Sequence, residues 1–145
     1  MTTVMHTRRF QSGVMLLEAL IGILIFSIGI LALVGMQTIA TKSVTDSRSR
    51  AEAGKLANQL IGDMWLNRAN LANYAYAGAG TAPSVLNNWI TQASAVLPNV
   101  AANPPIITIG ASALAGVTGN EVAITVRWQP PGESVHQYMT TAYIN

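Results

Sequence analysis

The feature that most constrains this chain is an apolar run from Val14 to Met36, in which Glu18 is the only charged residue. As a helix rising about 1.5 Å per residue, this run is long enough to cross a hydrocarbon core of roughly 30 Å. A soluble protein would have to bury such a helix completely, and the rest of the chain is too short to wrap it. The sequence therefore predicts one membrane-spanning helix over residues 14–36.

The segment before this run is short and basic, and it carries Arg8 and Arg9. A conventional secretory signal has an apolar stretch of about 7 to 15 residues closed by small residues at the cleavage site. Here the apolar stretch is longer, and it ends in Met36-Gln37-Thr38 with no Ala-x-Ala pattern. The arginine pair does not make a twin-arginine signal for the same reason. An uncleaved single-pass anchor remains the competing interpretation on these grounds.

Glu18 is the residue that a plain membrane anchor does not explain. A carboxylate in the middle of a membrane helix costs roughly 2.5–3.5 kcal/mol on insertion scales, and less near an interface. In a purely structural interpretation, Glu18 is an acidic residue near a helix N-terminus, where the helix macrodipole favours a negative charge. In a functional interpretation, its carboxylate binds a positively charged group of a partner. Gly13, which lacks a side chain, would let a protease approach the backbone closely.

The order Gly13, Val14-Met15-Leu16-Leu17, Glu18 behind a basic leader resembles the class III signal of type IV prepilins. The resemblance implies that a membrane aspartyl peptidase, the prepilin peptidase, cuts between Gly13 and Val14 and methylates the amine of Val14. It also implies a role for Glu18 in subunit assembly. Many members of the family begin their mature chain with Phe or Met, so Val14 departs from the usual pattern.

Cleavage at this place would leave a cationic amine four residues from the Glu18 carboxylate. Two subunits staggered along a helix bundle could then pair the amine of one with the carboxylate of the other. Each charge would offset the desolvation of the other, so burial would favour the correctly registered assembly.

The charge balance argues against nucleic acid as a partner. The chain has eight Lys plus Arg against six Asp plus Glu, and Arg8 and Arg9 belong to the leader. The basic excess is therefore lost on cleavage. There are no cysteines, which excludes disulfides and thiolate metal sites.

No constellation of residues indicates catalysis. In the sequence, His136 has no second histidine and no clustered acid nearby, and Ser134 two residues before it does not make a nucleophile–base pair. We predict no enzymatic activity, no cofactor, no metal and no small-molecule substrate.

Helical patterning continues beyond the membrane run. Apolar residues recur at spacings of three and four, and no proline occurs from Val14 to Ala82. The members of this stripe are Ala53, Leu56, Ala57, Leu60, Ile61 and Met64. We predict a rod of up to about 60 residues, with residues 37–74 as its part outside the membrane. The stretch Arg50–Trp65 also resembles the helix of PilV-type minor pilins.

Residues 75–145 are predicted to form a small head. Tyr74–Pro83 is rich in glycine and aperiodic, which is typical of a loop. Ser84 is expected to cap a second helix that ends at Pro98. Its buried face should contain Leu86, Trp89, Ile90, Ala93 and Leu97.

The period changes after this helix. We expect a short strand over Ile106–Ile109, a loop over Gly110–Asn120, and a strand in which Val122, Ile124, Val126 and Trp128 face the core. Pro130-Pro131-Gly132 should turn the chain into a last strand over His136–Ile144. The fold class predicted is α+β, with three or four antiparallel strands packed on the long helix.

The resemblance implies four segments: a leader over residues 1–13, a membrane helix over 14–36, its extension over 37–74 and a head over 75–145. It implies a minor type IV pilin, held in the inner membrane with its head in the periplasm and then built into a pilus. Its partners would be the prepilin peptidase, other minor pilins, the major pilin and the inner membrane.

Two alternatives stay open from sequence. One is a minor pseudopilin of a type II secretion system, and the other is a membrane-tethered receptor or adhesin that does not polymerise. Flanking charge alone would place the C-terminal side in the cytoplasm, because Lys42, Arg48, Arg50 and Lys55 follow the apolar run. The family resemblance implies the opposite orientation.

Overall fold

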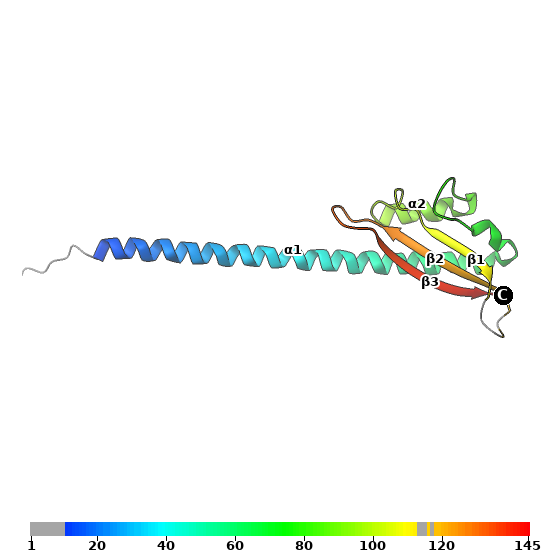
Figure 1. Ribbon diagram of the computed structural model, residues 1–145, viewed down its shortest axis with the longest axis horizontal. Helices are drawn as coiled ribbons and strands as arrows, with labels where there is room; N and C mark the ends of the chain where they lie inside the picture. Colours follow the sequence, from blue (N-terminus) through cyan, green and yellow to red (C-terminus); the bar gives the residue numbers. More distant parts are fainter. Residues whose placement is uncertain (1–10, 113–115, 117) are drawn as a thin grey trace, which may run out of the picture. The chain divides into compact units, whose positions relative to one another are not determined.

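The computed structural model describes residues 11–112, 116 and 118–145. The predicted leader up to position 10, and positions 113–115 and 117 of the predicted loop, lie outside the described residues. The fold is α+β, as predicted: a long apolar N-terminal helix and a small three-stranded antiparallel sheet (Figure 1). In chain order the elements are α1 (Gln11–Leu66), η1 (Arg68–Tyr74), η2 (Ser84–Leu86), α2 (Asn87–Val96), β1 (Ile106–Ala111), β2 (Asn120–Trp128) and β3 (His136–Ile144).

Helix α1 is 56 residues long and continues through every glycine of its sequence. The predicted extension of this helix to residue 74 is wrong, because α1 ends at Leu66 and the two-part 3-10 segment η1 follows. Two asparagines mark the change: Asn70 has non-helical backbone angles, and its side-chain amide donates to Asn67 Oδ1 at 2.9 Å. Such local bonds compete with the helical ladder, so asparagine favours a turn here.

The chain divides into two compact units, Met1–Val44 and Thr45–Asn145. In the described part of the first unit, the chain is α1 alone and its side chains from Gly13 onward are exposed. The second unit, called the head below, contains the end of α1 and all the other elements. The boundary falls inside α1, so one helix serves two structural environments.

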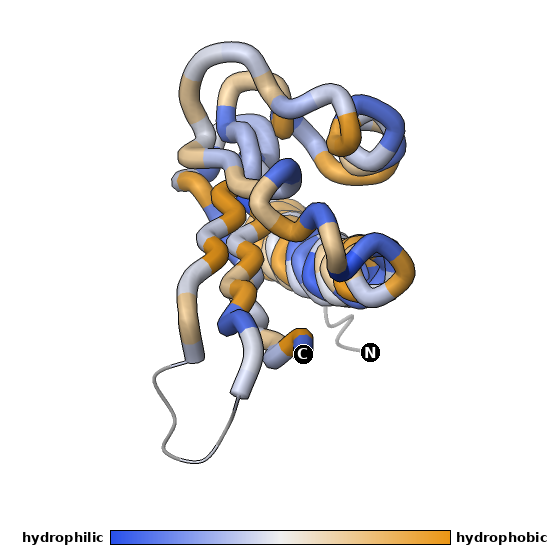
Figure 2. Tube along the Cα trace, turned by 90° about the vertical axis from the view of Figure 1, so that its right-hand side faces the viewer, coloured by the Kyte–Doolittle hydropathy of each residue, from blue (hydrophilic) through white to orange (hydrophobic). Residues whose placement is uncertain are grey.

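The core of the head forms around the predicted stripe of α1. Ala53, Leu56, Ala57, Leu60 and Met64 are buried there, and Ile61 packs against them at the margin. The tube in Figure 2 shows the sheet on one side of α1, with α2 over another part of its surface. The spacing of apolar residues thus correctly predicted which face of α1 carries the head.

The sheet has the order β1-β2-β3 with antiparallel pairing throughout. Alternation along β2 buries Val122, Ile124, Val126 and Trp128, as predicted. The ends of the loop differ from the prediction. Gly110 and Ala111 continue β1 and pair with Glu121 and Asn120, so the strands reach further than their apolar runs. Backbone pairing needs no apolar side chain, which is why the pattern alone missed these residues.

Helix α2 has the predicted buried face, but the predicted cap is wrong. Ser84 begins the 3-10 turn η2, and neither that turn nor α2 has a side-chain cap bond. Trp89 is 3% exposed, and its indole Nε1 donates to the carbonyl of Leu56 at 2.8 Å. This bond joins α2 directly to the backbone of α1 within the head.

Candidate processing and assembly site

The three residues singled out in the sequence lie together on the first turns of α1. Val14 and Glu18 are four residues apart and therefore share one face of the helix. With Leu17 and Ile21 they line a shallow depression of about 310 Å³. A partner that contacts Glu18 at this depression would therefore also meet Val14, the residue that follows the predicted cleavage site.

Among the described residues, a Cβ atom added at Gly13 would meet nothing within 4 Å. Packing against the described part of the chain therefore does not require glycine at this position. Glycine in a helix costs up to about 1 kcal/mol relative to alanine. A requirement for Gly13 would therefore come from whatever binds this segment, and not from packing inside the chain.

Glu18 is exposed among apolar neighbours. Within the described part of the chain its carboxylate has no ion pair and no hydrogen bond, and no group of three His, Cys, Asp or Glu residues could hold a metal ion. The large apolar side chains around it are exposed as well; Val14 is 66% and Leu17 59% exposed. A charge in these surroundings has no stabilising contact within the described residues.

The helix that carries this site is apolar enough to cross a membrane. Over residues Gly13–Leu66 its most apolar 18-residue window has a mean hydropathy of 2.7, and none of that window is buried inside the protein. By length and composition, one helix near the N-terminus can span a bilayer.

A second polar cluster lies in the head around His136, where the sequence indicated no clustered acid. That prediction is wrong. The ring atom Nδ1 lies 2.8 Å from Asp46 Oδ1, and Nε2 lies 3.3 Å from Glu133 Oε2. The indole of Trp128 lies beside the imidazole, with ring centroids 5.9 Å apart. The cluster connects α1, the β2–β3 turn and the start of β3.

Asp46 has two partners in this cluster. Its Oδ1 faces His136, and its Oδ2 accepts from Arg50 Nε at 3.1 Å. The hydrogen bond with His136, followed by that with Arg50, holds the pKa of the Asp46 carboxyl below its ordinary value of 3.8. Because Asp46 and His136 are 90 residues apart, nothing local in the sequence could have paired them.

The cluster does not arrange a nucleophile. Both ring nitrogens of His136 face carboxylates, and Ser134 is exposed. A serine hydrolase needs a histidine nitrogen directed at the serine oxygen. What the contacts support is therefore a polar attachment of the β2–β3 turn to α1 through His136 and Asp46.

No protein-family model, characterised protein or solved structure matches this chain.

Proposed function

We propose that this chain is a minor type IV pilin, a filament subunit made as a membrane-anchored precursor and cleaved between Gly13 and Val14. One observation carries the proposal: Glu18 lies on an exposed apolar face one helical turn from Val14, and among the described residues its carboxylate has no ion pair and no hydrogen bond. The basic leader before Gly13 and the small α+β head after the helix support it.

The proposed mechanism is structural and not catalytic. The apolar part of α1 holds the precursor in the inner membrane, with the head in the periplasm. The prepilin peptidase removes the leader with Arg8 and Arg9 and methylates the new amine of Val14. The helix then leaves the bilayer and packs among those of other pilins. There the amine of one subunit meets the Glu18 carboxylate of another, and each offsets the desolvation of the other.

Glu18 also distinguishes a filament subunit from a static tether. A tether gains nothing from a carboxylate in its membrane helix, where insertion scales assign it a cost of up to roughly 3.5 kcal/mol. An assembling subunit gains a specific partner from the same carboxylate. The cost in the monomer and the gain in the filament together favour release of the helix into the assembly.

The proposal is tested by the intact mass and N-terminal sequence of the full chain extracted from membranes, with and without the prepilin peptidase. We expect a chain that begins at Val14 and carries an added methyl group only when the peptidase is present. A chain that begins at Met1 in both cases would identify an ordinary anchor and end the pilin proposal.

Glu18 needs its own pair of variants. Glu18→Ala removes the carboxylate, and Glu18→Gln keeps its size while removing its charge. Both should still be cleaved, and both should enter filaments far less than the unchanged chain. Incorporation of Glu18→Gln at the unchanged level would show that the charge has no role in assembly.

A further inference from the structure

The sheet has an outer face that points away from α1. By alternation, the outward residues are Ile106, Thr108 and Gly110 on β1, Glu121, Ala123, Thr125 and Arg127 on β2, and Gln137, Met139, Thr141 and Tyr143 on β3. The loop at Gly78 comes close to Ile106 and Arg127. The opposite part of the face is open, and Met139 is 69% and Tyr143 37% exposed.

This face has two charged residues, Arg127 and Glu121, and one of them has hydrogen-bond partners within the head. The guanidinium of Arg127 donates from Nε and Nη2 to the carbonyl of Pro104, at 2.9 and 2.6 Å. Glu121 has neither an ion pair nor a hydrogen bond from its carboxylate among the described residues. The outer face therefore presents one unpaired charge, which is negative.

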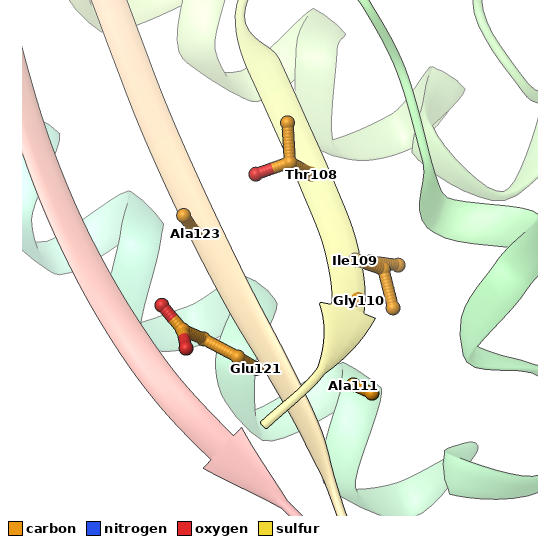
Figure 3. Close-up of a pocket in the computed structure, with 6 residues that line it drawn as sticks. All are labelled: Thr108, Ile109, Gly110, Ala111, Glu121 and Ala123. Atoms are coloured by element: carbon orange, nitrogen blue, oxygen red, sulfur yellow. The ribbon is translucent and has the colours of Figure 1, made fainter. Parts of the chain in front are cut away.

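A hollow lies beside this carboxylate. Gly110 and Ala123 leave a volume of about 220 Å³, with Thr108 on β1 and Glu121 on β2 also lining it (Figure 3). Among the described residues, a Cβ atom added at Gly110 would meet nothing within 4 Å, so no described side chain fills the space above it. The small residues Gly110 and Ala123 leave room for an aliphatic side chain, and the Glu121 carboxylate could pair with a cationic group at the end of that side chain. Lysine has this combination of an apolar stem and a charged head.

The head carries such a lysine on another of its surfaces. A groove of about 220 Å³ runs between α1 and α2 and is lined by Lys55, Gln59, Gln92 and Val96, among others. The side chain of Lys55 is 77% exposed, and its Nζ lies 3.9 Å from Glu52 Oε2, the limit of an ion pair. Val96 beside it is 51% exposed. Figure 2 shows α1 and α2 on one side of the head and the sheet on the other.

We propose that the heads of two copies of this chain pack together, with Lys55 of one copy seated in the hollow beside Glu121 of the next. The apolar side chains at the two surfaces, Val96 on one and Met139 with Tyr143 on the other, would cover each other. Opposite charges at the two surfaces set the register of the contact more than its strength.

This contact joins two different surfaces, so it leaves a free donor at one end and a free hollow at the other. Contacts of this kind extend into open helical arrays and do not close into dimers. The inference rests on the proposed function in one respect: a row of heads joined in this way would be part of a filament.

Cysteine cross-linking tests the contact, because the chain has no cysteine of its own. Thr108→Cys at the rim of the hollow and Val96→Cys in the groove leave Lys55 and Glu121 intact. Two differently tagged full-length chains, one with each substitution, are produced together and oxidised in the membrane. We expect a disulfide between the two tags. Asn73→Cys replaces Val96→Cys as the control, because Asn73 is exposed on η1 and lines a different depression of the head from the groove of Lys55 and Val96.

Charge reversal makes the test specific. Glu121→Lys in both tagged chains should lower the cross-linked fraction about tenfold, because it opposes two cations. Adding Lys55→Glu should restore the cross-link, which would also show that both variants fold. The inference is overturned if Asn73→Cys cross-links as well as Val96→Cys, if Thr108→Cys pairs only with itself, or if charge reversal has no effect.

The N-terminal sequence of the same samples separates this inference from the proposed function. Chains that begin at Val14 but form no disulfide would overturn the head contact alone. Chains that form the disulfide but begin at Met1 would support the head contact and overturn the pilin proposal.

Discussion

The two parts of α1 share one backbone conformation but differ in what surrounds their side chains. From Val14 to Val44 the large apolar residues are exposed; Leu31 is 71% and Phe26 68% exposed. In the head the same helix buries Leu60 to 1% and Met64 completely. The first part is therefore an exposed apolar helix that could cross a bilayer, whereas the second is the spine of a folded domain.

The comparison shows that helix length and helix stability have separate causes. Isolated helices gain little from propensity alone, and most helical stability in proteins comes from packing an apolar face. The head supplies that packing after Thr45. Before Thr45 the apolar side chains of α1 are exposed, so within the described residues this part of the helix has no such packing.

The largest effect is expected from a matched pair of leucines on this one helix. Leu60→Ala should lower the free energy of unfolding of the head by about 2–5 kcal/mol, because it leaves a cavity in the core. Leu31→Ala should change it by less than about 0.5 kcal/mol, because it removes no contact in the head. Denaturation of the full chain in detergent can be followed by tryptophan fluorescence, since Trp65, Trp89 and Trp128 all lie in the head. Equal losses from the two variants would mean that the helix unfolds as one unit.

A smaller change in stability is expected from the hydrogen bond that joins α2 to α1 within the head. Trp89→Phe removes the 2.8 Å bond to the Leu56 carbonyl, whereas Trp128 Nε1 has no hydrogen-bond partner within the described residues. Both substitutions shrink a buried indole to a phenyl ring. Trp89→Phe should therefore destabilise the head by about 1 kcal/mol more than Trp128→Phe, which is the usual net value of one hydrogen bond. Equal destabilisation by chemical denaturation would mean that this bond contributes nothing to the attachment of α2.

The same division explains what could be predicted from the sequence. Periodicity predicted the buried faces of α1, α2 and β2, because burial selects apolar residues at fixed spacing. It predicted the wrong end for α1, where asparagine side chains compete with the helical ladder, and it missed Gly110 and Ala111 in β1, where pairing is made by the backbone.

Of the candidate site, Val14 and Glu18 lie on one helix as predicted, because their relation is local. Gly13 is predicted in the leader before the helix, whereas α1 begins at Gln11 and includes it. The contact of His136 with Glu133 is local, because the two residues are three apart, and the sequence prediction missed it. The contact of His136 with Asp46 is not local, since it depends on where the β2–β3 turn meets α1, and single-sequence patterns contain no information on it. Roles that depend on other proteins, such as that of Glu18 in assembly, remain predictions until the partner is present.

The smallest effect is expected at Asp46, close to the point where the two parts of α1 meet. Its pKa is lowered in the folded head by His136 first and Arg50 second. A carboxyl with a lowered folded pKa binds protons more readily when unfolded, so it stabilises the fold above its unfolded pKa and loses that contribution as pH falls. At neutral pH the unchanged protein should therefore have a more stable head than the Asp46→Asn variant. This difference in stability should shrink when the pH falls below 3.8, the ordinary pKa of the carboxyl.

Two further substitutions separate the causes of this pH dependence. His136→Ala removes the larger cause and should flatten most of the acid-side difference, while Arg50→Ala should flatten less of it. The measurement is the denaturation midpoint of the full chain between neutral pH and about pH 3, followed by tryptophan fluorescence. If Arg50→Ala flattened the profile more than His136→Ala, the ion pair within α1 would dominate. Asp46 would then stabilise the helix alone, and the β2–β3 turn would not depend on it for its attachment to α1.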